Sequence, residues 1–188
     1  IRCLQRLEQS PGSNILVIGD TIVDRYVACD PIGLSNEAPV VVVKEIETQD
    51  FVGGAGIVAA HVAALGANCS YLSITGSDQR AMWVGQRLEE YGVNTFLIED
   101  VERPTTFKIR YMVDNQKLFR VSQLKEHMIS EDLENKAIET LESLAPSLHA
   151  VLVSDFVYGV ITPNILEVLA RLSKQFNFLV FGDLQCSS

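Results

Sequence analysis

The sequence has fewer basic than acidic residues, and it contains no long apolar run. Fifteen lysines and arginines stand against 24 aspartates and glutamates in 188 residues, a formal net charge of −9. Nucleic acid is therefore not an expected partner, because its binding depends on basic side chains that neutralise phosphates. The one basic cluster is too small to reverse this; it comprises Lys108, Arg110, Lys117 and Arg120. No apolar run approaches the roughly 18 residues of a membrane span, so we expect no membrane partner.

Cysteine and histidine are scarce and scattered. The cysteines are Cys3, Cys29, Cys69 and Cys186. They form no C-x-x-C pair, and the three histidines have no ligand-like spacing, so no metal site is expected. The first 14 residues contain no apolar core of the signal-peptide kind. Reduced thiols in a cytoplasmic protein are therefore expected. His61, in an alanine-rich helical pattern, is expected to be a structural histidine.

Two nucleotide-binding motifs are missing. The first apolar run is followed by GDTIVD (19–24), where a dinucleotide-binding oxidoreductase would carry G-x-G-x-x-G, and G-x-x-x-x-G-K-[ST] does not occur. A Rossmann-type oxidoreductase would fit the alternation of strands and helices described next, but this sequence lacks the fingerprint.

Strand and helix patterns alternate along the chain. Strands are predicted at 14–20, 67–75, 93–100, 149–155 and 177–183, and all of these except 93–100 are predicted to be buried. Helices are predicted from about 53 to 65, then at 76–92 with Ser77 or Asp78 as N-cap, at 130–145 and at 162–175. A β-branched stretch at 38–49 and a hairpin at 105–122 interrupt the alternation. This order predicts an α/β fold with a mostly parallel sheet and a small additional sheet around 31–49.

Aspartates end three of the predicted buried strands, namely Asp20, Asp155 and Asp183, and Asp24 follows the first of them. In open parallel sheets, ligands bind beyond the carboxyl ends of the strands. Each carboxylate could merely cap the segment that follows it. Together they favour a site for a polar small molecule, where carboxylates accept hydrogen bonds from hydroxyl groups.

Three glycines crowd the start of one predicted helix, in VGGAGIVAAHVAALGA (52–67). Glycine inside a helix costs roughly 1 kcal/mol relative to alanine. Either a tight turn packs against a strand here, or a ligand approaches the backbone of Gly53 and Gly54, where a Cβ would obstruct it.

Several stretches in this order resemble the amino-terminal part of the PfkB, or ribokinase-like, family of carbohydrate kinases. They are ILVIGDTIVDRYVACD (15–30), SNEAPVVVVKE (35–45), VGGAGIVAAHVAALGA (52–67), SITGSD (73–78) and LEEYGVNT (88–95). Within that family they are most similar to the heptose-phosphate kinases of ADP-heptose synthesis. The resemblance runs from about Asn14 to Asp183, and its specificity lies in the combined order of the motifs.

The resemblance implies a ribokinase-like fold and transfer of phosphate from ATP, with Mg²⁺, to a sugar or sugar-phosphate hydroxyl. It implies that Asp24 hydrogen-bonds sugar hydroxyls and that Gly53 and Gly54 let the backbone approach the sugar. Arg110 and Arg120 become candidates for binding a sugar phosphate. Residues 31–49 and 105–122 would form a β lid that closes over the sugar and joins two copies into a homodimer.

The sequence departs from the family pattern at three places. Ile57 replaces the asparagine of G-G-A-A-N, and the lysine of S-D-Y-x-K-G falls near Val157 or Tyr158. Asp183 is followed by Leu184 and Gln185 where the family has D-P-K. These changes remove a sugar-contacting amide and a cation near the transferred phosphate.

The family's G-A-G-D stretch, with its general base, does not occur before Ser188, and the chain begins with Ile1. We therefore expect residues 1–188 to be the amino-terminal, sugar-binding part of one ribokinase-like domain, without catalytic residues or the ATP-binding part. The alternative is a non-catalytic sugar-binding or dimerisation module derived from such a kinase.

Overall fold

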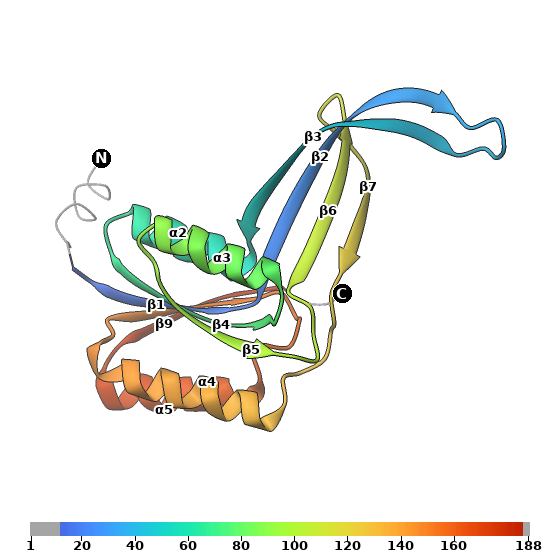
Figure 1. Cartoon of the computed structure of the whole chain (residues 1–188). Helices are drawn as coiled ribbons and strands as arrows, with labels where there is room; N and C mark the ends of the chain where they lie inside the picture. Colours follow the sequence, from blue (N-terminus) through green and yellow to red (C-terminus); the bar gives the residue numbers. More distant parts are fainter. Residues whose placement is uncertain (1–11, 186–188) are drawn as a thin grey trace.

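The computed structural model describes residues 12–185, which form two sheets and four α-helices. The first sheet is parallel, with the strand order β5-β4-β1-β8-β9. Its strands are β1 (Asn14–Gly19), β4 (Asn68–Gly76), β5 (Asn94–Asp100), β8 (Ala150–Asp155) and β9 (Leu179–Leu184). Helices α2 (Gly54–Ala64) and α3 (Gln79–Glu90) cover one face. Helices α4 (Glu131–Leu144) and α5 (Pro163–Phe176), with the short 3₁₀ helix η1 (Ala145–Ser147), lie on the other (Figure 1).

The core lies in two apolar layers on either side of this parallel sheet. Leu16 and Ile18 of β1 pack toward α4 and α5, whereas Val17 packs toward α2 and α3, and all three are at most 1% exposed. Burying one such side chain contributes about 1.5–3 kcal/mol. The continuous apolar runs of β1, β4 and β8 are largely buried, as predicted. The prediction of a buried strand was wrong for β9, which lies beside β8 at the edge of the sheet and is exposed throughout.

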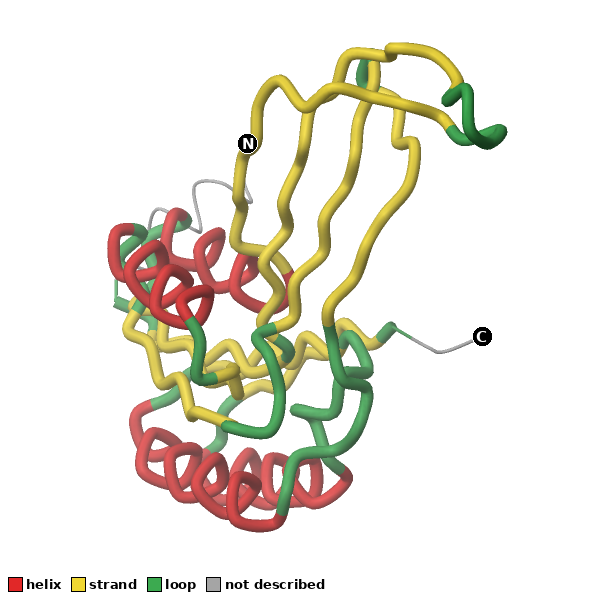
Figure 2. The backbone as a smooth tube through the Cα atoms, turned by 45° about the vertical axis from the view of Figure 1, so that its right-hand side comes forward, coloured by secondary structure: helices red, strands yellow, loops and turns green. Residues whose placement is uncertain are grey.

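The second sheet, called the lid sheet below, stands away from the layered part (Figure 2). Its order is β3-β2-β6-β7, made of β2 (Thr21–Leu34), β3 (Val41–Gly53), β6 (Thr106–Val113) and β7 (Gln116–Gln123). Strands β2 and β6 are parallel, and the other two pairs are antiparallel. The predicted hairpin at 105–122 is present, with its turn at Asp114 and Asn115, both at positive φ.

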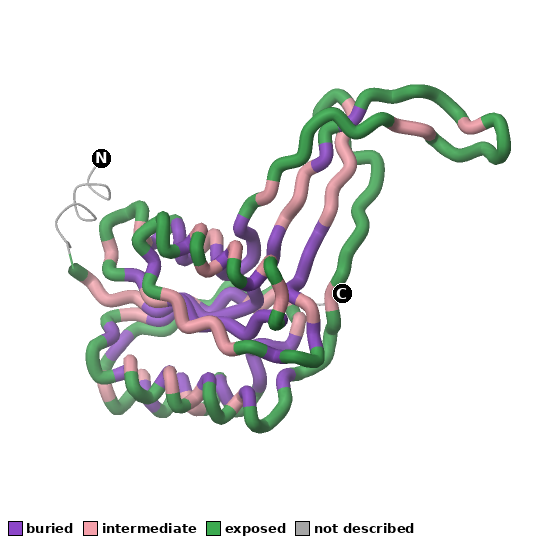
Figure 3. Tube along the Cα trace, in the orientation of Figure 1, coloured by how far each residue is buried: buried purple, intermediate pink, exposed green. Residues whose placement is uncertain are grey.

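The lid sheet is larger than the sequence pattern predicts, because residues 21–30 also belong to it. They mix apolar with charged side chains, and on β2 the apolar Val23 and Val27 are buried while Arg25 and Asp30 are not. The distal lid is exposed, whereas the parallel sheet is largely buried (Figure 3).

Helix boundaries follow the capping residues closely. Asp78, not Ser77, caps α3 by accepting a hydrogen bond from the Ala81 amide at 3.0 Å. Thr162 caps α5 in the same way, whereas Ser130 precedes α4 without a side-chain cap. Helix α2 ends at Ala64, and Gly66 follows at φ +91°.

Within residues 12–185, no helix is both long and apolar enough to cross a membrane. Cys29 and Cys69 are buried free thiols, while Cys3 and Cys186 lie outside the described residues. His61 is exposed on α2, so the expectation of a structural histidine was wrong. The alanines around it supply the buried face of the helix instead.

Candidate functional site

A cavity of about 730 Å³ lies where the lid sheet meets the layered part. Strands β2 and β3 supply most of its wall. The rest comes from the start of α2, the end of β6 with its turn into β7, and Phe156 after β8. Its lining comprises Asp24, Tyr26, Ala28, Glu47, Gln49, Phe51, Val52, Gly53, Gly54, Ile57, Met112, Asn115 and Phe156. This mixture of aromatic surface with a few carboxylate and amide groups is typical of small-molecule sites.

Asp24 is held on the cavity wall by an ion pair with Arg110. Alternation along β2 turns Asp24, Tyr26 and Ala28 to the cavity, and Arg110 reaches Asp24 from the neighbouring strand β6. Both side chains are less than one-fifth exposed, and the guanidinium of Arg110 lies 5.3 Å from the centre of the Tyr26 ring. The structure therefore brings together two of the predicted site residues.

Arg120 lies directly opposite Arg110 in the β6–β7 register. Paired residues of antiparallel strands project from the same face, so Arg120 belongs to the same side of the lid sheet as Asp24. It is exposed and does not line the cavity in this structure.

Protein atoms already occupy the space that a Cβ would need at the crowded glycines. A Cβ on Gly53 would lie 2.2 Å from Oδ2 of Asp24, and one on Gly54 would lie 2.3 Å from the carbonyl oxygen of Asp20. Gly54 also has φ +57°, a left-handed conformation that favours glycine. Gly53 thus makes room first for the Asp24 carboxylate, and both glycines line the cavity.

Asp20 holds the segment that follows β8. Its carboxylate accepts hydrogen bonds from the backbone amides of Phe156, Tyr158 and Val160, at 2.7, 3.3 and 3.3 Å. Burial raises the pKa of this 1%-exposed carboxyl, and the backbone hydrogen bonds oppose that shift. Asp20 therefore supports the site and is not free to bind a ligand.

The other two strand-end aspartates do not line the cavity. Asp155 accepts a hydrogen bond from the amide of Val157 in its own turn, and Asp183 is exposed on β9. The capping interpretation thus holds for Asp155, and only Asp24 of the four aspartates reaches the cavity.

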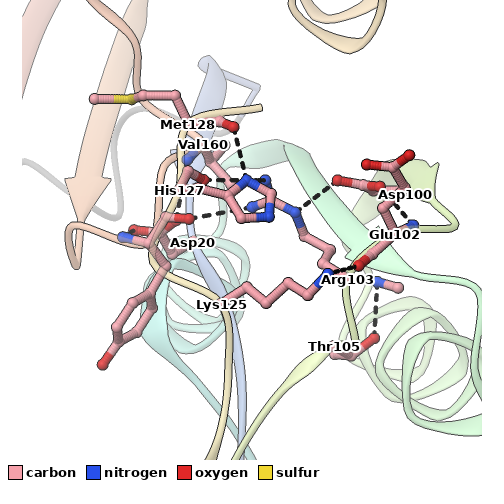
Figure 4. Close-up of polar contacts among 11 residues, drawn as sticks. Asp20, Asp100, Glu102, Arg103, Thr105, Lys125, His127, Met128 and Val160 are labelled. Atoms are coloured by element: carbon pink, nitrogen blue, oxygen red, sulfur yellow. Dashed lines mark hydrogen bonds and ion pairs between the residues drawn. The ribbon is translucent and has the colours of Figure 1, made fainter. Parts of the chain in front are cut away.

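Arg103 is a second support for the same segment, and sequence analysis missed it. Its guanidinium, 6% exposed, binds Asp100 at 2.7 Å and donates hydrogen bonds to the carbonyl oxygens of Tyr158 and His127, both at 3.1 Å (Figure 4). Gly159, at φ +93°, packs so closely that a Cβ would lie 2.1 Å from the His127 carbonyl oxygen. The spacing of Asp100 and Arg103 just after a predicted strand was the available signal.

A family model described as pfkB family carbohydrate kinase matches residues 13–182. The chain belongs to this family. Proteins named bifunctional protein HldE are similar to it: that of Campylobacter jejuni (strain RM1221) is 37% identical over 177 residues, and that of Helicobacter hepaticus 32% over 178. These alignments cover 94% and 93% of the chain but only 36% of each relative. The chain therefore spans about a third of the length of these curated relatives.

Solved structures with 14–16% identity show the same fold. Phosphofructokinase-2 from Escherichia coli, in complex with substrates and products, superposes with a TM-score of 0.72 over 92% of this chain and 54% of its own. Ribokinase from Arabidopsis thaliana, complexed with ribose and ATP, gives 0.65 over 94% and 55%. The ribokinase-like architecture expected from the sequence is confirmed.

Proposed function

We propose that this chain is the sugar-binding part of an ATP-dependent kinase that phosphorylates a hydroxyl group of a sugar phosphate, of the heptose-phosphate kind. Asp24, which lines the lid cavity and is paired with Arg110 of the neighbouring strand, carries this proposal. Family membership and the similarity to HldE proteins support it.

The two halves of the lid sheet contribute side chains of opposite charge to the proposed site. The carboxylates Asp24 and Glu47 lie on β2 and β3, whereas the guanidinium groups of Arg110 and Arg120 lie on β6 and β7. In our proposal Asp24 accepts hydrogen bonds from sugar hydroxyls, while the backbone at Gly53 and Gly54 lies against the ring. The arginines bind the phosphate of the substrate, a geometry that guanidinium groups suit.

ATP with Mg²⁺ is the proposed phosphoryl donor, and it would supply the group that is transferred. Among residues 12–185, no group of three or more His, Cys, Asp or Glu side chains could hold a metal ion. The described residues do not fit a magnesium site by themselves, so we assign no step to the metal. The chain's own contribution is to position the acceptor sugar and to shield it from water.

We also propose a cytoplasmic location and a homodimer formed through the lid. The two free, buried cysteines support a reducing compartment. Aliphatic side chains near the lid tip support the dimer, since Ile32 and Leu34 are 67% and 70% exposed.

Sugar binding by Asp24→Asn tests the proposed function. We expect the affinity for sedoheptulose 7-phosphate, a seven-carbon sugar phosphate used as probe, to fall about 10- to 100-fold in calorimetric titration. Asp50→Asn is the matched control: Asp50 is another lid aspartate paired with an arginine, Arg25, at 2.7 Å, and it does not line the cavity. Equal affinities for wild type and Asp24→Asn would contradict the proposal.

The second candidate is a non-catalytic sugar-binding or dimerisation module, and Ile57 favours it. This apolar side chain lines the cavity where the family pattern has an asparagine, so a hydrogen-bonding group is missing there. Probe-dependent formation of ADP from ATP by the product of the complete coding sequence separates the candidates. Binding without transfer would support the module.

A further inference from the structure

Lys108 on β6 is a largely buried lysine without a counter-ion among the described residues. The residue is 8% exposed, and no hydrogen bond or ion pair joins its ammonium to a residue in the 12–185 range. Its Nζ is not among the fully enclosed side-chain atoms that lack a partner, so the ammonium keeps contact with solvent and is open to a ligand. Lysine is almost never buried to this extent unless it is paired, because desolvation of a charge is costly. An anion beside the ammonium would therefore be favourable, and the described part of the protein does not supply one.

The ammonium of Lys108 lies beside the lid cavity. Lys108 is the register partner of Asp24 in the parallel β2–β6 pair, so its side chain leaves the lid sheet on the Asp24 side. Its Nζ lies 5.7 Å from the ring centre of Phe156, which lines the cavity, and 5.0 Å from that of Tyr158. Aromatic rings attract a cation but leave its charge uncompensated.

The carboxylate opposite Lys108 in the β2–β6 register is already engaged. This acid, Asp24, is paired with Arg110. The segment that carries Phe156 and Tyr158 is anchored by Asp20 and Arg103, so the two rings stay in place beside the ammonium. A ligand in the cavity is thus the available source of the missing negative charge.

We infer that Lys108 binds a phosphoryl group of the ligand in the lid cavity. The inference rests on the proposed function and deepens it, since it names a cation at the root of the lid in addition to Arg110 and Arg120. An ammonium presents three donors, and a doubly charged phosphate accepts them as short, charge-assisted hydrogen bonds. The group is either the phosphate that the sugar carries or the phosphoryl group in transfer.

Calorimetric titrations of the full chain test this assignment. The probes are sedoheptulose 7-phosphate, and inorganic phosphate both alone and added to protein saturated with that sugar phosphate. We expect Lys108→Gln to weaken phosphate-dependent binding about tenfold or more, and Lys108→Arg to retain most of it. Lys117→Gln, an exposed lid lysine near the β6–β7 turn, is the matched control and should bind as wild type does.

The titrations also distinguish the two sources of the phosphoryl group. Weaker binding of the sugar phosphate by Lys108→Gln assigns Lys108 to the substrate's own phosphate. Weaker binding confined to the inorganic phosphate added afterwards assigns it to the transferred group. Unchanged affinity in every titration overturns the inference.

Thermal unfolding separates ligand binding from a structural role. Without ligand, Lys108→Gln should keep or raise the melting temperature, because it removes a buried charge that has no counter-ion. An equal, clear fall in the melting temperatures of Lys108→Gln and Lys108→Arg would instead show that the side chain serves packing, against the inference.

Asp24→Asn, measured in the same titrations, separates this inference from the proposed function. If wild type binds inorganic phosphate through Lys108 but no sugar phosphate, the anion site stands and the proposed function fails. If Asp24→Asn loses sugar-phosphate binding while Lys108→Gln loses nothing, the proposed function stands and the role of Lys108 is overturned.

Discussion

Asp24 of β2 and Gly53 of β3 lie close together on neighbouring strands. The Asp24 carboxylate leaves no space for a side chain at position 53. The carboxylate of Asp24 lies where a Cβ at position 53 would be, and Arg110 holds it there from the other side. A site that depends on one missing methyl group is sensitive to the smallest substitution.

Gly53→Ala should therefore destabilise the protein and displace the Asp24 carboxylate. A Cβ 2.2 Å from Oδ2 cannot be accommodated without movement, and such overpacking costs about 1–3 kcal/mol. Urea unfolding measures the change in free energy. Gly85→Ala in α3 is the control: its nearest contact would be 3.6 Å away, so alanine should stabilise the helix by about 0.5–1 kcal/mol. Equal stability of Gly53→Ala and wild type would contradict this account.

The residues of the site differ in how far sequence reveals them. Asp24, Gly53 and Gly54 stand in recognisable motifs, and the structure places all three on the cavity. Lys108 and Arg103 stand in no motif that we could interpret, because their environments are built by segments about 50 residues away, around Tyr158. Burial and pairing of a charged side chain depend on such distant contacts.

At the scale of elements, Asp78 joins helix α3 to the start of the lid strand β6. Its carboxylate caps α3 and also accepts hydrogen bonds from the amide and the hydroxyl of Thr105, at 3.0 and 2.8 Å. Burial raises the pKa of Asp78, but these hydrogen bonds outweigh burial and hold the pKa below its ordinary value of 3.8.

This lowered pKa predicts how stability depends on pH. The folded protein holds the Asp78 proton less tightly than the unfolded chain, so the stabilisation is complete above about pH 4. It is lost as the pH falls through the lower folded pKa. Asp78→Asn keeps a cap but cannot titrate, so its free energy of unfolding should fall less than that of wild type between pH 5 and pH 2. Urea unfolding across this range measures it.

Asp132→Asn is the control for that experiment, because Asp132 is an exposed residue in the first turn of α4 with no hydrogen bond from another segment in the described structure. It should show the acid dependence of wild type. Parallel curves for Asp78→Asn and wild type would show that Asp78 does not contribute.

At the scale of the whole molecule, the lid projects from the layered part and exposes its tip (Figures 1 and 3). Large aliphatic side chains on this hairpin are 56–70% exposed; they are Ile32, Leu34, Val40, Val41 and Ile46. A second copy of the same hairpin would cover them, which is the homodimer we propose.

Leu34→Lys should therefore shift the chain from dimer to monomer, because a charge at a buried apolar contact is unfavourable. Light scattering coupled to size-exclusion chromatography, over a range of concentrations, measures the mass. Val101→Lys is the control, since Val101 is 83% exposed in the turn after β5 and outside the lid. Identical masses for wild type and Leu34→Lys would argue against a dimer formed through this hairpin.

The sequence by itself determined the layered fold and the place of Asp24 in it. Apolar runs, capping residues and glycine stops act locally, so their periodicity predicts the parallel strands and the helices between them. It did not show β2 as a strand of the lid, because residues 21–30 mix apolar with charged side chains and are stabilised by pairing with β3 and β6.

Only the tertiary structure decided which charges serve the site and which support it. Asp20 looked like a binding residue, but its carboxylate accepts hydrogen bonds from three backbone amides of the segment after β8. Lys108 stood in the sequence only as one member of a small basic cluster, but it lies largely buried beside two aromatic rings, without a counter-ion among the described residues. Such outcomes depend on the distances between segments far apart in the chain, which local sequence patterns do not encode.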